Sequence, residues 1–297
     1  MLKPELLAAG FVCCVALVAP AAPFLLGPAH AQQAEAGLTQ PLEASPATAL
    51  ADLLRMDETF AIMADEGRAH GAEIENGTFP GRGGAGWAAT VDRIYDQGGM
   101  RVRFLAAFEA ALKDDPAAIQ AAQAFFGSEL GQRILTLELD ARRAMGNEDV
   151  SEAAEVTAEK MKAARDPRLR LVRKMIEAGD LVEMNVAGAL SANLAFARGM
   201  AETLPKAQAQ PLDDMMIEVW GQEGALRAST TTWLYSYLVM AYAPLSDDEM
   251  QSYVDFWASP EGKRVNAALF TAFDAAFVPV SAELGSAVGA MAQSRDI

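Results

Sequence analysis

Residues that could perform catalysis or hold a metal are few in this chain and poorly spaced for either task. His70 is the one histidine after residue 31, and a lone histidine without cysteine partners cannot form a typical zinc site. We expect its side chain to be solvated at the surface. Residues 127–131 (Gly-Ser-Glu-Leu-Gly) do not form the Gly-x-Ser-x-Gly turn of serine hydrolases, which also follows a strand. We therefore predict no catalytic, cofactor-binding or metal-ligating residue and no cofactor, and an enzymatic activity ranks third, behind the two functions given below.

Residues 81–86 (Gly-Arg-Gly-Gly-Ala-Gly) form the one segment that invites a phosphate-binding interpretation. Backbone N–H groups ahead of a helix can bind an anion. However, no strand precedes the segment, and it lacks the Gly-Lys-Ser/Thr ending that phosphate loops require. The composition instead favours a flexible connection between two helices.

A nine-residue motif occurs twice, at 125–133 and 256–264, with an offset of 131 residues. Its shared or equivalent positions are Phe125, Phe126, Ser128, Gly131 and Arg133 in the first copy, and Phe256, Trp257, Ser259, Pro260, Gly262 and Arg264 in the second. The serine is placed to cap a helix, and proline is favoured at the first helical position. Glycine in the first turn permits close approach of another element, and each arginine either reaches an acidic neighbour or extends along the surface. We interpret the motif as a structural corner between two helices.

A cluster of seven cations lies between the two motif copies of this otherwise acidic chain. Its members are Lys160, Lys162, Arg165, Arg168, Arg170, Arg173 and Lys174, and we refer to them as the basic patch. The patch could face an anionic envelope component, such as a phospholipid headgroup, or an acidic partner. Alternatively, it neutralises the acidic surfaces of the segments on either side.

The elements that carry these residues are predicted to be helices throughout. Apolar residues recur at spacings of three and four, as in Leu50, Leu53, Met56, Phe60 and Met63, and no alternating strand pattern occurs. We expect one helix after a Ser45 cap, a kinked helix or two helices across 87–112 with the interruption at Gly98-Gly99, and long helices at 167–204 and 216–240. A capping box at 246–249 should begin the next helix, and the last should run from Pro260 to Pro279. The predicted fold class is all-α.

The chain divides into a signal, two related helical repeats and a connector. The predicted boundaries are a signal peptide at 1–31, a flexible leader at 32–45, a first repeat at 46–146, a polar connector helix at 147–166, a second repeat at 167–285 and a tail at 286–297. The repeats are expected to be two tandem helical bundles, each ending in the corner motif.

The first thirty-one residues have the pattern of an export signal. Lys3 precedes an uncharged stretch from Leu6 to Leu26, and Ala-His-Ala at 29–31 predicts cleavage after Ala31. Both cysteines lie in this segment, so the mature chain would have none. We expect a product in the periplasm or secreted that does not span the membrane, although the alternative of a retained N-terminal anchor is open.

The second motif, preceded by Leu245-Ser246-Asp247-Asp248-Glu249, resembles the signature of a bacterial family known as domain of unknown function 2059. Its members are exported helical proteins with the motif aromatic, aromatic, x, Ser or Thr, Pro, x, Gly. The first copy departs from it, with Glu129 in place of the proline. The resemblance implies two tandem copies of this domain and brings no catalytic residue, because the family has no established activity.

Two functions agree with these patterns. Acidic residues outnumber basic ones by 40 to 24, which makes nucleic acid an unfavourable partner. The first hypothesis is a non-catalytic envelope protein that acts as an interaction or scaffold module for an unidentified protein. The alternative is a carrier that binds an apolar or lipid-like ligand between its two halves, as suggested by fourteen methionines and by Trp220, Trp233, Tyr235 and Tyr237. Core packing also explains such residues.

Overall fold

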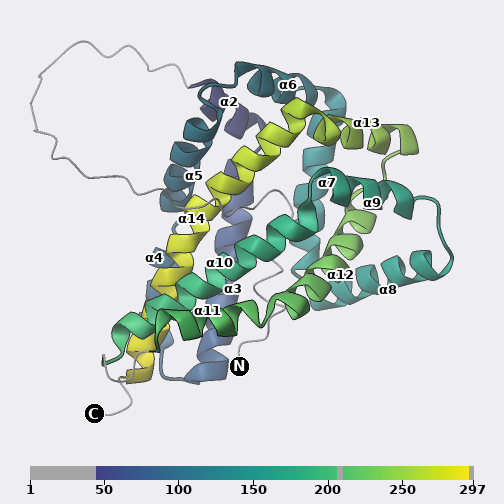
Figure 1. The fold of residues 1–297 in the computed structure, drawn as a ribbon. Coiled ribbons are helices and arrows are strands. Elements are labelled where there is room, and N and C mark those ends of the chain that lie inside the picture. Colours follow the sequence, from purple (N-terminus) through teal and green to yellow (C-terminus); the bar gives the residue numbers. More distant parts are fainter. Residues whose placement is uncertain (1–44, 206–209, 294–297) are drawn as a thin grey trace, which may run out of the picture.

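The computed structural model describes residues 45–205 and 210–293 (Figure 1). Every regular element in these two ranges is an α-helix and none is a strand, which confirms the predicted all-α class. The predicted signal peptide, its cleavage after Ala31 and the leader, apart from its last residue Ser45, lie outside the described residues.

Six helices make up the part of the chain that we call the first half. They are α2 (Pro46–Leu53), α3 (Met56–Thr78), α4 (Gly84–Ile94), α5 (Gln97–Leu112), α6 (Pro116–Phe126) and α7 (Glu129–Met145). Residues 81–86 span the end of the turn between α3 and α4 and the first turn of α4.

Helix α8 (Glu148–Ala163) follows, at the edge of the molecule in Figure 1, and leads to a second set of six helices that we call the second half. These are α9 (Leu169–Ala178), α10 (Leu181–Thr203), α11 (Leu212–Trp220), α12 (Glu223–Ala241), α13 (Asp247–Ala258) and α14 (Pro260–Gln293).

Helix starts agree with the capping residues that the sequence indicates. Ser45 Oγ accepts a hydrogen bond from Thr48 N at 3.0 Å, and Pro46 occupies the first position of α2. At α13 the predicted capping box is present. Ser246 Oγ accepts from Glu249 N at 3.2 Å, and the Glu249 carboxylate accepts from Ser246 N at 2.7 Å.

Three predicted long helices are wrong, because each is broken once. The breaks fall between α2 and α3, between α9 and α10, and between α11 and α12. Arg55 and Asp180, with φ of 59° and 50°, precede α3 and α10 in the left-handed region. The spacing of apolar residues did not indicate the first two breaks, since the helices on both sides of each bury residues in the same core.

The interruption in segment 87–112 produces two helices, which was one of the two alternatives. It lies at Tyr95–Asp96, and the glycine pair falls inside α5. Asp96 Oδ2 accepts a hydrogen bond from Gly99 N at 2.6 Å, so this acidic side chain sets the start of α5.

Helix α14 passes through Pro279 and continues to Gln293, so the predicted end at Pro279 is wrong. Residues 286–293, expected to form part of a tail, belong to the same helix. A proline removes one backbone hydrogen bond, yet Val280, Leu284 and Val288 beyond it are buried. Their burial against neighbouring helices stabilises the continuation.

Helix α14 packs most extensively against α10 and also lies along α5 (Figure 1). Its contact with α10 is close enough to require glycine: a Cβ atom on Gly199 would lie 2.0 Å from Ala282 O, and one on Gly285 would lie 2.1 Å from Phe196 O. By length and composition α14 is the one helix in the described ranges that could cross a membrane. In this fold its buried residues form part of the protein core.

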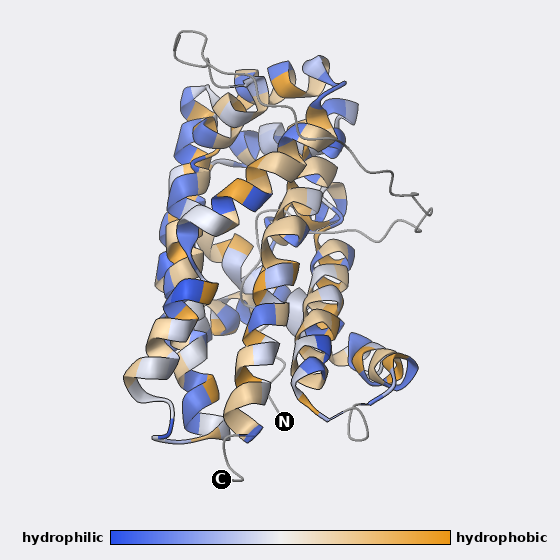
Figure 2. Cartoon of the chain, turned by 90° about the vertical axis from the view of Figure 1, so that its left-hand side faces the viewer, coloured by the Kyte–Doolittle hydropathy of each residue, from blue (hydrophilic) through white to orange (hydrophobic). Residues whose placement is uncertain are grey.

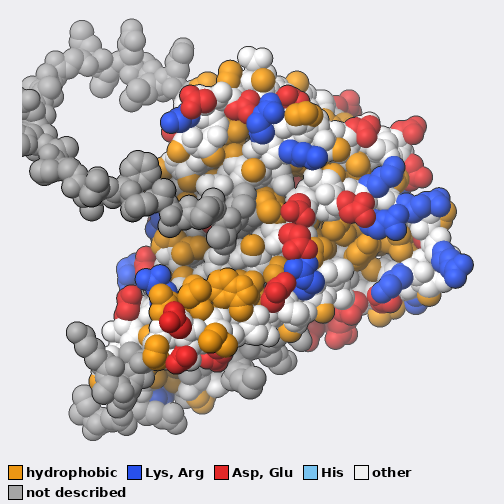
Figure 3. Space-filling model, in the orientation of Figure 1, with side chains coloured by type: hydrophobic (Ala, Val, Ile, Leu, Met, Phe, Trp, Pro, Cys, Tyr) orange, Lys and Arg blue, Asp and Glu red, His pale blue; other side chains and the backbone are white. Residues whose placement is uncertain are grey.

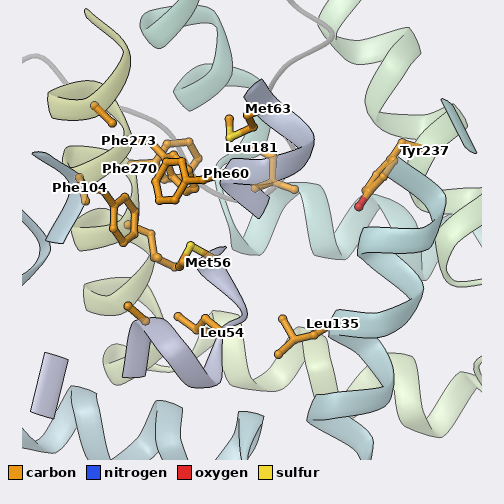
Figure 4. Packing of buried hydrophobic residues seen from close by; sticks show 14 of the residues in the cluster. Leu54, Met56, Phe60, Met63, Phe104, Leu135, Leu181, Tyr237, Phe270 and Phe273 are labelled. Atoms are coloured by element: carbon orange, nitrogen blue, oxygen red, sulfur yellow. The ribbon is translucent and has the colours of Figure 1, made fainter. Parts of the chain in front are cut away.

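The core is a single cluster of buried apolar residues drawn from both halves. Figure 4 shows Phe60 of α3 beside Phe270 and Phe273 of α14. The ring centroids of Phe60 and Phe104 are 5.3 Å apart, and those of Phe104 and Phe273 are 4.9 Å apart. Hydrophobic and hydrophilic residues alternate along the helices (Figure 2), and the buried apolar ones among them form this cluster.

The last helix of each half packs against the fourth helix of the other half. Helix α14 lies against α5, and α7 lies against α12. Neither half therefore encloses its own core, in contrast to the expected picture of two bundles joined in series.

Candidate functional site

The two copies of the repeated motif form corners with the same hydrogen bonds. Ser128 Oγ accepts from Gly131 N at 3.0 Å and donates to Phe125 O at 2.6 Å. Ser259 Oγ accepts from Gly262 N at 3.0 Å and donates to Phe256 O at 2.6 Å. The serines thus cap α7 and α14, as the sequence predicted, and Pro260 occupies the first position of α14.

The motif glycines are required by the close approach of the preceding helix. A Cβ atom on Gly131 would lie 2.3 Å from Phe125 O, and one on Gly262 would lie 2.0 Å from Phe256 O. The close approach predicted at the glycines is present. The approaching element is the C-terminal end of the preceding helix, α6 at Gly131 and α13 at Gly262.

Aromatic residues of the two corners pack directly against each other. Phe125 and Phe256 are stacked with centroids 4.7 Å apart, and Phe126 meets Phe256 edge-on at 5.3 Å. Trp257 lies 5.8 Å from Phe126. The two copies therefore form one contact between the halves, which the sequence did not indicate.

The motif arginines reach across this contact in both directions. Arg133 donates to Glu249 Oε1 and to Pro244 O, each at 2.7 Å, at the start of α13. Arg264 pairs with Asp115, the cap of α6, and with Glu261 at 2.9 Å. Both arginines therefore reach acidic neighbours, which was one of the two alternatives. Hydrogen bonds from Ser246 N and Oγ, together with the charge and hydrogen bond of Arg133, lower the pKa of Glu249. All these contacts are structural.

The glycine-rich segment is already occupied by an anion from the chain itself. Glu75 Oε1 accepts hydrogen bonds from Gly83 N at 3.0 Å and from Gly84 N at 2.9 Å. Because a carboxylate satisfies the N–H groups that a phosphate would use, this loop serves to join α3 to α4.

His70 is not solvated, so that prediction is wrong. Its side chain is 14% exposed, and its Nδ1 atom lies 3.9 Å from Glu73 Oε2 and has no hydrogen-bond partner among the described residues. Burial lowers the pKa of His70, and the nearby charge of Glu73 partly opposes the shift. No group of three or more potential metal ligands gathers within the ranges that the structure describes.

A buried acidic residue, Glu138 of α7, was missed by the sequence analysis. Its Oε1 atom accepts from Tyr242 Oη at 2.6 Å and from Tyr253 Oη at 2.9 Å, and its backbone oxygen accepts from Tyr237 Oη at 2.9 Å. Burial, followed by the charge of Glu138, raises the pKa of Tyr242 well above its usual value. The sequence feature that could have indicated the burial of Glu138 is its position four residues after Ile134, on the inward-facing side of α7.

The basic patch lies around the connection between α8 and α9, and Figure 3 shows Lys and Arg side chains gathered at that edge. Three members have partners nearby: Lys162 binds Glu159 at 3.0 Å, Arg173 lies 3.6 Å from Glu177, and Lys174 donates to Gln251 at 3.0 Å. Arg168 is half-buried, pairs with Asp247 and donates to Tyr242 O at 2.6 Å. It fixes the start of α9 to the loop between α12 and α13.

The remaining members of the patch, Lys160, Arg165 and Arg170, are exposed and form no ion pair within the described part of the chain. Lys160 lies in a shallow depression on the outer face of α8 together with Glu152, Glu155 and Glu159. Both predicted roles of the patch thus retain support: some cations neutralise acidic neighbours, and others are available to an external anion.

A pocket of about 510 Å³, open to solvent on one side, lies beneath α8, where this helix packs against parts of α9, α12 and α13. Its walls are mainly apolar and include three methionines. The lining residues are Asp149, Val150, Ala153, Ala154, Thr157 and Met161 of α8, Arg168 and Val172 at α9, and Leu238, Val239, Met240, Ala243 and Met250 of the second half. Small side chains on α8 leave this space open.

Helix α8 contributes two fully buried residues, and both are alanines. They are Ala154 and Ala158, and the helix packs mainly against α12.

Helix α11 presents apolar side chains to the surface. Leu212, Ile217 and Trp220 are exposed, Ile217 by 72% and Trp220 by 50%, while Met215 and Val219 are buried. Asp213, Asp214 and Glu218 surround them on the same helix. Trp220, which suggested an apolar ligand between the two halves, is part of this exposed face.

No protein-family model, curated protein or solved structure matches this chain. The resemblance to domain of unknown function 2059 therefore stays a prediction, and functional arguments rest on the described geometry.

Proposed function

We propose that the mature chain is a non-catalytic exported protein of the bacterial envelope that binds an apolar or lipid-like ligand beneath α8. The pocket of about 510 Å³ with mainly apolar walls carries this proposal, since such a volume is within the range of small-molecule sites. Export rests on the pattern of residues 1–31, with cleavage after Ala31.

The proposed site lies at a different position from the site that the carrier hypothesis predicted. The ligand was expected between the two halves and next to tryptophans. The pocket instead lies between α8 and the second half, and methionines are its flexible lining. Methionine side chains adapt to ligands of varied shape, which suits a carrier of apolar chains.

We further infer that the halves are diverged copies of one helical unit, with the connector at 147–166 joining repeats at 46–146 and 167–285. Supporting this, the two corners share the same hydrogen bonds at an offset of 131 residues. Helices α3 and α10 also have 23 residues each and both follow a residue in the left-handed region. Membership in the domain of unknown function 2059 family is part of this proposal.

Native mass spectrometry of protein purified from the envelope tests the ligand proposal. We expect a bound lipid-like molecule, and we expect Ala153→Phe to expel it because residue 153 lines the pocket. Val156→Phe is the matched control, since Val156 lies on the outer face of the same helix. Absence of ligand from the wild-type protein, together with no binding of an apolar dye, would contradict the proposal.

A second candidate function is an interaction or scaffold module for an envelope protein. The exposed Leu212, Ile217 and Trp220 of α11 favour it, because apolar aromatic side chains commonly anchor protein interfaces. Crosslinking in intact cells should yield a partner that is lost from the Ile217→Gln/Trp220→Gln double variant. The Val102→Gln variant, altered at another exposed apolar residue on α5, should retain it. Equal yields from all three proteins would rule out this surface.

A further inference from the structure

Helix α11 buries one side and presents an apolar strip on another. Met215 and Val219 pack inward, and the helix lies against α10. Since each residue of an α-helix is turned by about 100° from the one before, Ile217 points away from this buried side, and Leu212 and Trp220 lie between the two. Leu212 is 48% exposed, Ile217 72% and Trp220 50%. We call these three residues the α11 apolar face.

Three carboxylates accompany the α11 apolar face. Asp213 lies between Trp220 and Ile217 around the helix, and Asp214 and Glu218 lie beyond Ile217. All three are exposed, none forms an ion pair within the described ranges, and α11 contains no Lys or Arg. In Figure 3, hydrophobic side chains and carboxylates lie side by side over this part of the surface. The face thus combines apolar contact area with negative charge that is not neutralised.

This charge argues against three occupants of the face. Residues 32–44 of the same chain contain Glu35 and Glu43 and neither Lys nor Arg. A second copy has the same net charge of −16, and two α11 apolar faces in contact would bring three carboxylates from each copy together. Anionic headgroups of a membrane would also be repelled. An occupant with positive charge is favoured instead.

We propose that α11 docks a basic amphipathic helix of another envelope protein, with its apolar stripe on the α11 apolar face and its Lys or Arg side chains against Asp213, Asp214 and Glu218. This inference rests on the second candidate function, the interaction module, and specifies its partner. From Leu212 to Trp220 the face extends about 12 Å along the helix axis, which matches two turns of a second amphipathic helix. The apolar side chains supply affinity, and the carboxylates select the partner.

Binding of three fluorescein-labelled peptides to the mature protein, followed by fluorescence anisotropy, tests the charge preference. The peptides share one leucine stripe and the same hydrocarbon crosslink that holds them helical, and their polar side consists of lysine, glutamine or glutamate. We expect the lysine peptide to bind about tenfold more tightly than the glutamine peptide at low salt, which three exposed ion pairs together can supply. The glutamate peptide should bind most weakly, and added salt should reduce the differences.

Two triple variants with the same change of charge locate the preference. The first, Asp213→Asn/Asp214→Asn/Glu218→Gln, should lose most of the lysine preference and bind the glutamine peptide as the wild type does. The second, Glu152→Gln/Glu155→Gln/Glu159→Gln, is altered on the outer face of α8 and should keep the preference. This pair separates local carboxylates from the negative charge of the whole chain.

Two further variants test the apolar contact. Ile217→Gln/Trp220→Gln should weaken the binding of every peptide at least about tenfold, because truncating central apolar anchors removes most of the affinity of an interface. Val102→Gln, altered at an exposed apolar residue of α5, should bind like the wild type.

The outcomes separate this inference from the interaction-module function. Equal binding of the three peptides, lost in Ile217→Gln/Trp220→Gln, would overturn the basic partner and leave the docking surface intact. A lysine preference that survives neutralisation of the α11 carboxylates would likewise overturn it. Absence of binding by all three peptides would overturn both. Self-association in sedimentation, or binding to anionic phospholipid vesicles, that Ile217→Gln/Trp220→Gln abolishes would assign the face to a second copy or to a membrane instead.

Discussion

The backbone oxygen of Phe256 lies 2.0 Å from the position that a Cβ atom on Gly262 would take. Since this neighbour is backbone rather than a flexible side chain, Gly262→Ala must displace the end of α13 or the start of α14. We expect it to lower the free energy of unfolding by about 1–3 kcal/mol, as overpacking does in well-packed cores. Gly131→Ala, with Phe125 O at 2.3 Å, should act similarly. Urea unfolding followed by circular dichroism measures both.

Gly224→Ala is the control for these substitutions. Gly224 lies inside α12 with open space around its Cβ position. Alanine is the better helix former, so stability should be unchanged or rise by up to about 1 kcal/mol. If Gly262→Ala and Gly224→Ala behave alike, close packing is not the reason for glycine in the motif.

Glu138 is predicted to be essential to the contact between α7 and the second half. Glu138→Leu leaves the hydroxyl groups of Tyr242 and Tyr253 without their acceptor, and both tyrosines are buried. An unsatisfied buried polar group costs about 1–3 kcal/mol, so we expect a loss of at least about 2 kcal/mol in thermal or urea unfolding.

Adding Tyr242→Phe and Tyr253→Phe to Glu138→Leu distinguishes this cause from lost packing. Removing both members of a buried hydrogen bond is far less costly than removing one, so the triple variant should regain part of the stability. Tyr235→Phe should be close to neutral, because no hydrogen bond of that hydroxyl occurs within the described residues. A triple variant less stable than Glu138→Leu would contradict the proposed hydrogen-bond network.

The helix corners could be predicted from the sequence because their causes are local. Ser128 and Ser259 cap their helices through atoms three residues away, and the Ser246–Glu249 capping box is equally short-range. Spacing of three and four residues likewise identifies helices wherever one face is buried. The all-α class follows from such patterns alone.

The breaks, the course of α14 and the pocket depend on tertiary contacts and were missed. Arg55 and Asp180 adopt left-handed conformations that nothing in their neighbours' residue types demands. Pro279 lies inside a helix because Val280 and Leu284 are buried beyond it. The pocket exists because alanines of α8 happen to face α12, a pairing that no sequence pattern reveals.

Neither half is expected to fold alone. Phe60 and Phe104 of the first half pack against Phe273 of α14, with centroid distances of 5.9 and 4.9 Å. A fragment spanning residues 45–146 lacks α14, so these rings would meet water. We expect the fragment to unfold without a cooperative transition in calorimetry, while the chain from residue 45 to 297 unfolds cooperatively. Mixing the fragment with residues 147–297 should restore helicity, because the contacts of α14 with α5 and of α7 with α12 can then form again.

Asp274 of α14 should make the protein less stable as the pH rises. Burial raises its pKa from 3.8 to about 6, so the folded state binds this proton more tightly than the unfolded state does. Between about pH 4 and pH 6 the folded protein therefore loses stability from this group, and above pH 6 the full cost is present. Asp274→Asn should remove this cost, with a gain of about 1–3 kcal/mol at pH 7 that vanishes near pH 4.

The difference in the free energy of unfolding between Asp274→Asn and wild type, measured as a function of pH, separates the effect of Asp274 from that of the other carboxylates. Glu183→Gln should change the free energy of unfolding in the opposite direction at pH 7, because hydrogen bonding to Arg227 lowers the pKa of Glu183. That variant should be slightly less stable than wild type at pH 7 and equal to it once Glu183 is protonated in both states. Urea unfolding at pH 4, 5, 6, 7 and 8 checks both curves. A gain for Asp274→Asn that is the same at pH 4 and pH 7 would mean that the charge of Asp274 is not the cause.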